Sequence, residues 1–180
     1  MTTFPHRLMG ASVLDVTTYE EVEADRGATG QAFVVVLASS LASGVGAMGF
    51  ARAGAPFVGG VFFWSAISLI AWAAWALLVF EIGGRLLPEP ETRVDVGELL
   101  RTIGFSSAPG MLRIFGIVPE LALPVFILTT VWMLVTMVVA VRQALDYRST
   151  ARAIGVCTLG LAFALIIAFA FGFFLGPSVS

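Results

Sequence analysis

The sequence predicts an all-α protein, a polytopic integral membrane bundle of five transmembrane helices with a short amphipathic amino-terminal segment. The first observation behind this prediction is that Asp, Glu, Lys and Arg are absent from four long stretches, residues 27–51, 53–80, 121–141 and 153–180. A helix that crosses the hydrocarbon core needs about 20 mostly apolar residues, and each stretch supplies them. The second is that 58% of the residues are hydrophobic, whereas soluble domains contain roughly 45–50%. Most of the chain is therefore expected to be surrounded by lipid.

Residues 1–30 predict a cytoplasmic segment of short amphipathic helices. Its apolar side chains are expected on the membrane surface; these are Phe4, Leu8, Met9, Val13 and Leu14. Thr17 with Glu20, and Thr18 with Glu21, fit the spacing of a capping box, in which a hydroxyl and a carboxylate bind free backbone N–H groups at a helix start. A short helix is therefore expected to begin at these threonines.

The membrane domain is expected to cover residues 31–176. Four of its spans are plain from the uncharged stretches, near residues 31–51, 57–82, 120–141 and 152–175. A short turn at Pro56 separates the first two. A polar connector containing Pro88 and Pro90 follows the second span, because proline opposes helix continuation.

The third span, near residues 99–118, is ambiguous because it carries Arg113 and is interrupted by Pro109-Gly110. It could cross as a kinked helix, or enter the membrane and return on the same side. The arginines favour crossing, because basic residues accumulate in cytoplasmic loops. With the amino terminus inside, crossing places eight of the ten arginines inside; these are Arg7, Arg26, Arg85, Arg93, Arg101, Arg142, Arg148 and Arg152. We therefore expect a multi-pass protein of the cell membrane, with a cytoplasmic amino terminus and the carboxyl terminus outside.

Small residues recur every fourth position along the last span and predict a helix-packing surface, since small side chains let helices approach closely in lipid. They are Gly160, Ala164, Ala168, Gly172 and Gly176. This surface could form a homodimer interface, or it could serve contacts within the bundle.

Residues that support catalysis or metal binding are almost absent from the spans. The single histidine, His6, lies outside them, and the chain contains no lysine and no HExxH motif. A serine nucleophile would have no base within the spans. We therefore expect no catalytic, cofactor or metal site. The net charge of −2 gives no reason to expect a nucleic-acid partner.

The break in the third span is the strongest candidate for a polar site, because ionisable residues inside a membrane are costly and are usually functional. The candidate residues are Gly104, Ser106, Ser107, Pro109, Gly110, Arg113 and Glu120. In one interpretation, Arg113 and freed backbone carbonyls line a cavity. In the other, the Arg113 side chain extends to the outer interface near Glu120.

Other charged and aromatic positions allow weaker interpretations. Glu81 is expected to meet headgroups or Arg85, and Arg142 and Asp146 are expected on one helix face at the cytoplasmic end of the fourth span. One face of the second span carries aromatic and small residues that could line a groove or simply pack, namely Phe57, Trp64, Ser68, Ala71 and Trp75.

Three segments resemble the YIP family (Ypt/Rab-interacting proteins), in particular its short prokaryotic members. They are residues 19–32, from Tyr-Glu-Glu-Val to Gly-Gln-Ala, residues 104–110, Gly-Phe-Ser-Ser-Ala-Pro-Gly, and residues 131–147, which end in Arg-Gln-Ala-Leu-Asp-Tyr. The resemblance extends over about residues 8–176. It implies five spans, a cytoplasmic amino terminus and self-association. Eukaryotic members act in vesicle traffic and bind Rab GTPases through a long cytosolic region; the short region here lacks their Asp-Leu-Tyr-Gly-Pro motif, so GTPase binding is not expected.

The resulting functional prediction is a non-enzymatic membrane scaffold or adaptor, serving membrane organisation, trafficking or a larger membrane complex. Its expected partners are membrane lipids and either a second copy of the chain or another membrane protein. The alternative is a small-solute transporter or channel that uses the broken third span around Pro109 and Arg113.

Overall fold

A computed structural model describes residues 3–51, 54–88 and 95–175, with side chains except those of residues 164, 165 and 167–175. The elements are α1 (Phe4–Ser12), α2 (Val16–Ala24), α3 (Ala28–Ala47), the 3₁₀ helix η1 (Met48–Phe50), α4 (Phe57–Glu81), the π-helix η2 (Ile82–Leu86), α5 (Val96–Ser106), the 3₁₀ helix η3 (Ala108–Ile117), α6 (Pro119–Ala144) and α7 (Thr150–Leu175). No strand occurs in these ranges, and the all-α membrane fold is confirmed.

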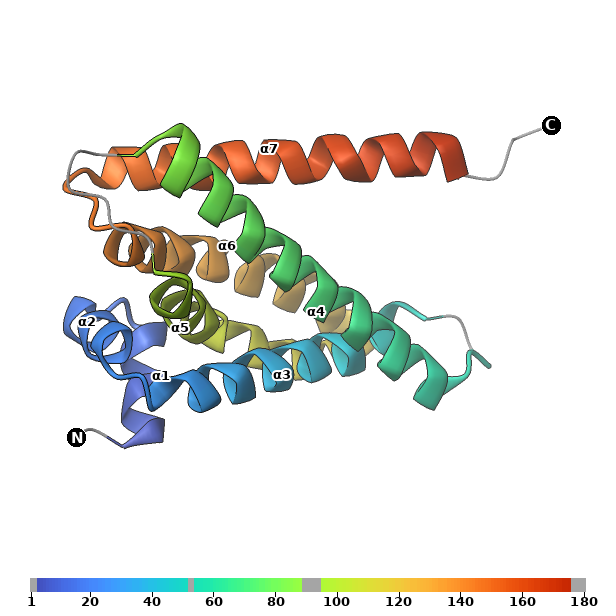
Figure 1. Cartoon of the computed structure of the whole chain (residues 1–180). Coiled ribbons are helices and arrows are strands. Elements are labelled where there is room, and N and C mark those ends of the chain that lie inside the picture. The colour runs from blue at the N-terminus through green and yellow to red at the C-terminus, as the bar shows by residue number, and fades with distance from the viewer. Residues whose placement is uncertain (1–2, 52–53, 89–94, 176–180) are drawn as a thin grey trace.

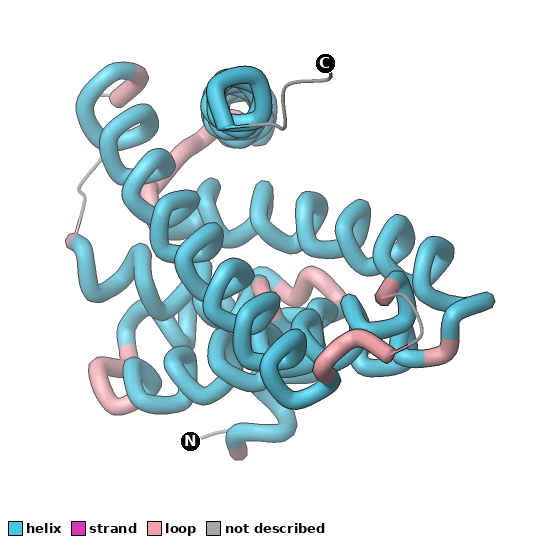
Figure 2. Tube along the Cα trace, turned by 90° about the vertical axis from the view of Figure 1, so that its right-hand side faces the viewer, coloured by secondary structure: helices cyan, strands magenta, loops and turns pink. Residues whose placement is uncertain are grey.

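The long elements run back and forth between two ends of a helical bundle (Figure 1). α3 leads away from the end that carries α1 and α2, α4 returns, α5 with η3 leads away again, α6 returns and α7 leads away. α7 lies at the edge of the bundle, where Figure 2 shows it end-on. Three helices of the described residues are long and apolar enough to cross a membrane: α3 with η1, α4 with η2, and α6.

The third pass is built from two kinds of helix and lies along the whole length of α3. Gly104 packs against Ala32 near the start of α3, and Gly116 packs against Gly49 just beyond its end. A 3₁₀ helix rises about 2.0 Å per residue and an α-helix about 1.5 Å, so residues 99–117 extend roughly 30 Å. That length matches the hydrocarbon core of a bilayer. The segment does not turn back on itself.

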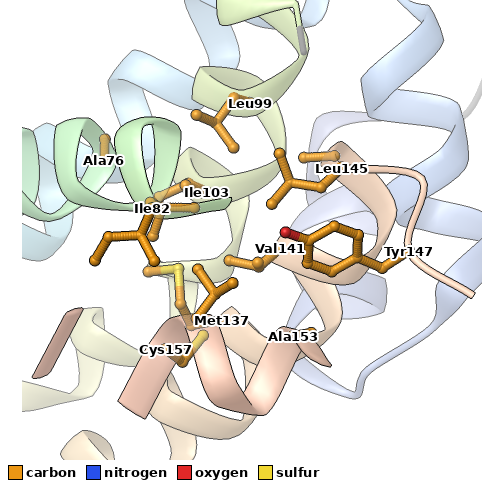
Figure 3. Packing of buried hydrophobic residues seen from close by; sticks show 13 residues of the cluster. Ala76, Ile82, Leu99, Ile103, Met137, Val141, Leu145, Tyr147, Ala153 and Cys157 are labelled. Carbon is orange, nitrogen blue, oxygen red and sulfur yellow. The ribbon is translucent and has the colours of Figure 1, made fainter. Parts of the chain in front are cut away.

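A hydrophobic core joins the last four helices at the end of the bundle that carries α1 and α2. Figure 3 shows Ile103 of α5 together with Met137 and Val141 of α6, and Cys157 of α7 lies beside them. The Tyr147 hydroxyl closes this core, because it lies 2.8 Å from the Gly83 carbonyl oxygen and 2.9 Å from the Leu87 carbonyl oxygen. The connection after α6 is thereby tied to the end of α4.

The amino-terminal helices pack on the bundle, so the expectation that their apolar side chains lie on the membrane surface is only partly right. Tyr19 is fully buried in a cluster with Phe105 of α5 and Ala140 of α6, and Phe4 and Leu8 pack against this cluster. Met9, Val13, Leu14 and Val16 remain exposed. Burial raises the pKa of the Tyr19 phenol. We call α1 and α2 together the amino-terminal hairpin.

The start of α2 differs from the predicted capping box. Asp15 is the N-cap, and its carboxylate accepts from the Thr17 backbone N–H at 3.1 Å and from the Thr18 hydroxyl at 2.8 Å. These hydrogen bonds, the Thr18 hydroxyl first, lower the pKa of Asp15. An aspartate is a better cap than a threonine, and Asp15 precedes Thr17 by two residues, so the helix begins at Val16.

Candidate functional site

A groove lies between α3, α4, α6 and α7, beside the start of η3. Its volume is about 350 Å³. The lining residues are Val36, Ser39, Ser40, Ser68, Ala71, Trp72, Trp75, Ser107, Arg113, Thr130, Met133, Leu134, Met137 and Leu161. The walls are mainly apolar, with several hydroxyl groups, and Arg113 is the one cation among the described lining residues. No carboxylate lines the groove within the described part of the chain.

Arg113 is the charged group of this groove and is held by neutral hydroxyls. Its Nε donates to Thr129 Oγ1 at 3.2 Å, its Nη1 to Ser43 Oγ at 3.3 Å, and its Nη2 to Thr130 Oγ1 at 2.8 Å. Its Cζ lies 5.1 Å from the ring centroid of Phe126, a cation–π distance. Arg113 makes none of the ion pairs found among the described residues.

The place of Arg113 depends on how closely η3 approaches α3. A Cβ added to Gly46 would lie only 1.9 Å from the Arg113 carbonyl oxygen, and one added to Gly110 would lie 2.1 Å from Ser39 Oγ. Glycine at both positions therefore allows the backbone of η3 to pack directly on α3. η3 thereby carries Arg113 to a position from which its guanidinium bonds to Thr129 and Thr130 of α6.

The contacts of Arg113 favour the first of its two predicted interpretations, a residue that lines a cavity. Its guanidinium bonds to α3 and α6 within the bundle, whereas Glu120 is exposed in the first turn of α6. An arginine at the bilayer centre costs about 2.5–3.5 kcal/mol on insertion scales. Three hydroxyl acceptors and an aromatic face offset that cost, because hydrogen bonds to a charged group and a cation–π contact are both favourable. The geometry is that of a groove-lining cation.

Two tryptophans of α4 line the groove with their rings. The Nε1 atoms of Trp72 and Trp75 are buried and have no acceptor among the described residues. Buried polar groups are nearly always hydrogen-bonded, so such exceptions call for an explanation. The residues predicted to share an aromatic face of the second span have two different environments. Ser68, Ala71 and Trp75 line the groove. Phe57 and Trp64 are exposed.

The other residues predicted around the break have structural contacts. Gly104 packs against Ala32. The Ser106 and Ser107 hydroxyls donate to the Ile103 carbonyl oxygen at 2.8 and 3.2 Å. Of these, only Ser107 lines the groove, and Pro109 stands in the first turn of η3 beside it.

The small residues of the last span are described only at Gly160, where an added Cβ would lie 3.5 Å from the Trp75 ring of α4. Gly160 therefore packs within the bundle. The Ala164, Ala168 and Gly172 side-chain positions and the whole of Gly176 lie outside the described residues.

Contrary to the prediction, Arg142 and Asp146 do not share a helix face at the end of the fourth span. α6 ends at Ala144, and Asp146 follows with φ of 52°, so Asp146 lies beyond the helix. Arg142 instead donates from Nε to the Tyr147 carbonyl oxygen at 3.3 Å. The expected contact between Glu81 and Arg85 is present, at 2.8 Å.

Sequence reasoning missed a polar cluster that fastens the amino-terminal hairpin. Arg7 is 3% exposed and bonds to Glu21 and Asp25, each at 2.7 Å. Arg101 of α5 is also buried, and it donates to the carbonyl oxygens of Val22 and Glu23 at the end of α2. The only available signal was the number of charges in residues 1–30, which does not reveal their partners.

Glu23 has an unusual titration at the same place. Burial, and after it the nearby carboxylates of Asp146, Glu98 and Glu20, raises the pKa of Glu23 to about 7, while Arg101 acts in the opposite direction. No group of three or more His, Cys, Asp or Glu residues that could hold a metal ion occurs in the described ranges.

Comparison with known families gives one match. The family model described as the Yip1 domain matches residues 15–171. No curated protein and no solved structure matches the chain.

Proposed function

The chain belongs to the Yip1 domain family of membrane proteins, and on this premise we propose that it is a non-enzymatic scaffold or adaptor of the cell membrane. The resemblance in the three quoted segments predicted this family. Membrane organisation, trafficking or membership of a larger complex are the forms that such a role would take. Expected partners are lipids and either a second copy of the chain or another membrane protein.

The observation that carries the proposal is how little of α4 the bundle covers. Only 11% of its most apolar window is buried, against 44% for α3 and 28% for α6. Its exposed surface includes Gly59, Ala66 and Ala73, which recur every seventh residue. In lipid, helices associate where small residues permit close approach. α4 therefore offers a face on which a helix of a partner could pack.

Arrangement in the membrane forms part of the proposal: five crossings, a cytoplasmic amino terminus and the carboxyl terminus outside. The alternating passes in Figure 1 support this layout. Figure 1 draws α1 and α2, the start of α3, η2, α5, the end of α6 and the start of α7 at one end of the bundle. These elements and the connections between them contain most of the arginines, namely Arg7, Arg26, Arg85, Arg101, Arg142, Arg148 and Arg152. By the positive-inside tendency that end faces the cytoplasm. A reporter tag in the connection after Tyr147 should then be cytoplasmic, and a tag beside Pro56 should be outside.

Cross-linking tests the scaffold proposal. In a Cys157→Ala background, which removes the only cysteine, Ala66→Cys and Ala73→Cys place thiols on the exposed face of α4. Ala76→Cys is the matched control, because Ala76 is 4% exposed. Oxidation in native membranes should yield a cross-linked dimer, or an adduct with another protein, from the first two variants only. A strictly monomeric protein with no adduct would refute the proposal, and Ala168→Cys extends the test to α7.

A small-solute transporter or channel remains the second candidate, because the groove holds a cation beside a break in the third pass. In proteoliposomes, flux of an anionic solute should depend on the charge of Arg113. Flux that is unchanged in Arg113→Ala would remove the groove from any transport path.

A further inference from the structure

We propose that the groove between α3, α4, α6 and α7 binds an anionic amphiphile of the membrane. Its acidic head, a carboxylate or a phosphate, bonds to Arg113, and its hydrocarbon chain lies along Met133, Met137 and Trp75. This site is independent of the scaffold role proposed above. It requires only the groove and its donors.

Charge is the first argument for an acidic head. A guanidinium carries five N–H donors, and Arg113 uses three of them on the hydroxyls of Ser43, Thr129 and Thr130. One N–H on each of Nη1 and Nη2 remains for a ligand. Because no carboxylate lines the groove in the described part of the chain, an acidic ligand would meet a positive site without a competing anion.

The hydrogen-bond donors beside the groove also favour an acidic head. The indole N–H groups of Trp72 and Trp75 are buried without an acceptor among the described residues, and both rings line the groove. The two indole nitrogens are themselves closed to solvent, so the charged donors that a ligand in the groove can reach are those of Arg113. Ionised carboxylates and phosphates supply acceptors and no donors, whereas a cationic ligand would leave the remaining Arg113 N–H groups unpaired.

The shape of the groove selects an amphiphile over a free anion. On α6 it extends from Thr130 to Met137 and on α4 from Ser68 to Trp75, which corresponds to about 10 Å along each helix. Arg113 bonds at the Thr130 end, and the opposite end is formed by Met137 and Trp75. A free phosphate would leave this apolar length uncovered, whereas a hydrocarbon chain attached to the head would fill it.

The walls and the opening also suit a lipid. A volume of about 350 Å³ falls within the roughly 300–1,000 Å³ of small-molecule sites. Methionine side chains adapt their shape to irregular apolar ligands, and Met133 and Met137 supply two of them. Thr130 and Leu161 are exposed at the edge of the lining, so a lipid could enter sideways from the bilayer.

Fluorescence quenching by brominated lipids tests the proposal, since bromine in a lipid chain quenches nearby tryptophan. The full-length protein in neutral detergent carries Trp64→Phe, which removes an exposed indole. Three tryptophans remain: Trp72 and Trp75, which line the groove and report on it, and Trp132, which is not among the lining residues. Brominated stearate should quench saturably, and its uncharged methyl ester should bind at least about tenfold more weakly, because a hydrogen bond to a charged group contributes about 1.5–3 kcal/mol. Arg113→Gln should weaken binding of the acid by a similar factor. Arg85→Gln, outside the groove, should leave it unchanged.

Each further outcome decides a part of the proposal. Saturable quenching by brominated phosphatidylglycerol, reversed by the unbrominated lipid, would identify a phospholipid as the source of the acidic head; quenching by stearate alone would identify a free fatty acid. Equal affinity for stearate and its ester, or displacement of stearate by inorganic phosphate at similar concentration, would overturn the amphiphile site. The comparison of acid with ester needs no change at Arg113, so it decides the matter even if Arg113→Gln fails to fold.

Discussion

Replacing Gly46 by alanine should loosen the contact that positions Arg113. The new Cβ would lie 1.9 Å from the Arg113 carbonyl oxygen and 3.1 Å from a Phe126 ring carbon. The first contact involves backbone on both sides, so no side-chain rotation can relieve it. To reach the roughly 3 Å below which such contacts are essentially never seen, α3 and η3 must separate by about 1 Å.

The expected cost follows from that displacement. Overpacking a well-packed interior costs about 1–3 kcal/mol, and the upper part of that range applies here because two helices must shift. The substitution also gains up to about 1 kcal/mol of helix propensity, since glycine is poorer than alanine inside a helix. A net loss of about 1–2 kcal/mol is therefore expected. Gly30→Ala is the matched control in the same helix, because an added Cβ there meets no atom within 4 Å.

Cys157 provides the assay. It is the only cysteine of the chain and is 6% exposed in the core of Figure 3, so a thiol-reactive dye labels it when the bundle unfolds. In a thermal ramp in detergent, Gly46→Ala should lower the labelling midpoint by roughly 2–8 °C. Gly30→Ala should leave it unchanged or raise it slightly. Equal midpoints for the two variants would refute the inference that backbone contact between α3 and η3 holds the third pass in place.

Two further predictions concern the amino-terminal hairpin. Trp132→Phe removes the 2.7 Å hydrogen bond from its Nε1 to the Ser12 carbonyl oxygen and should destabilise hairpin docking by about 0.5–1.5 kcal/mol, measured as faster amide hydrogen exchange in residues 4–24; unchanged exchange would contradict it. Because the pKa of Glu23 is raised from 4.5 to about 7, the folded protein favours the protonated carboxyl, so the contribution of Glu23 to docking is fully present below pH 4.5 and is lost as pH rises through 7. Exchange in the hairpin, corrected for intrinsic rates, should therefore be faster at about pH 8 than at about pH 5, and Glu23→Gln should abolish the difference; a variant that keeps it would assign the dependence to another group.

Much of the helical framework could be predicted because its signals are local. Uncharged stretches of sufficient length marked the helices, and the Pro109-Gly110 pair marked the place where the third pass changes from α-helix to 3₁₀ helix. The same reasoning named Arg113 and Ser107, which both line the groove. Because removing a charge from water into a membrane costs free energy, an isolated arginine in an apolar segment can be identified as a candidate functional residue from the sequence.

The partners of those residues could not be predicted, because they depend on how each helix is rotated about its axis and how deeply it sits. Thr129, Thr130 and Ser43 lie on other helices, and nothing local distinguishes them from the remaining serines and threonines of the spans. The hairpin shows the same limit: Phe4 and Leu8 have the pattern of a membrane-surface helix, yet they pack on the bundle because α5 and α6 present a matching apolar surface around Phe105.

The sequence by itself thus determined that this is a multi-helix membrane protein of the Yip1 domain family, and where its helices begin and end to within a few residues. Tertiary structure alone decided that Arg113 meets hydroxyls and a groove, that two indole N–H groups find no acceptor within the described ranges, and that the amino-terminal hairpin is fastened through Arg7 and Arg101. The physical reason is that hydrophobicity and backbone breaks act over neighbouring residues, whereas close approach at Gly46 and Gly110 depends on surfaces far apart in the chain.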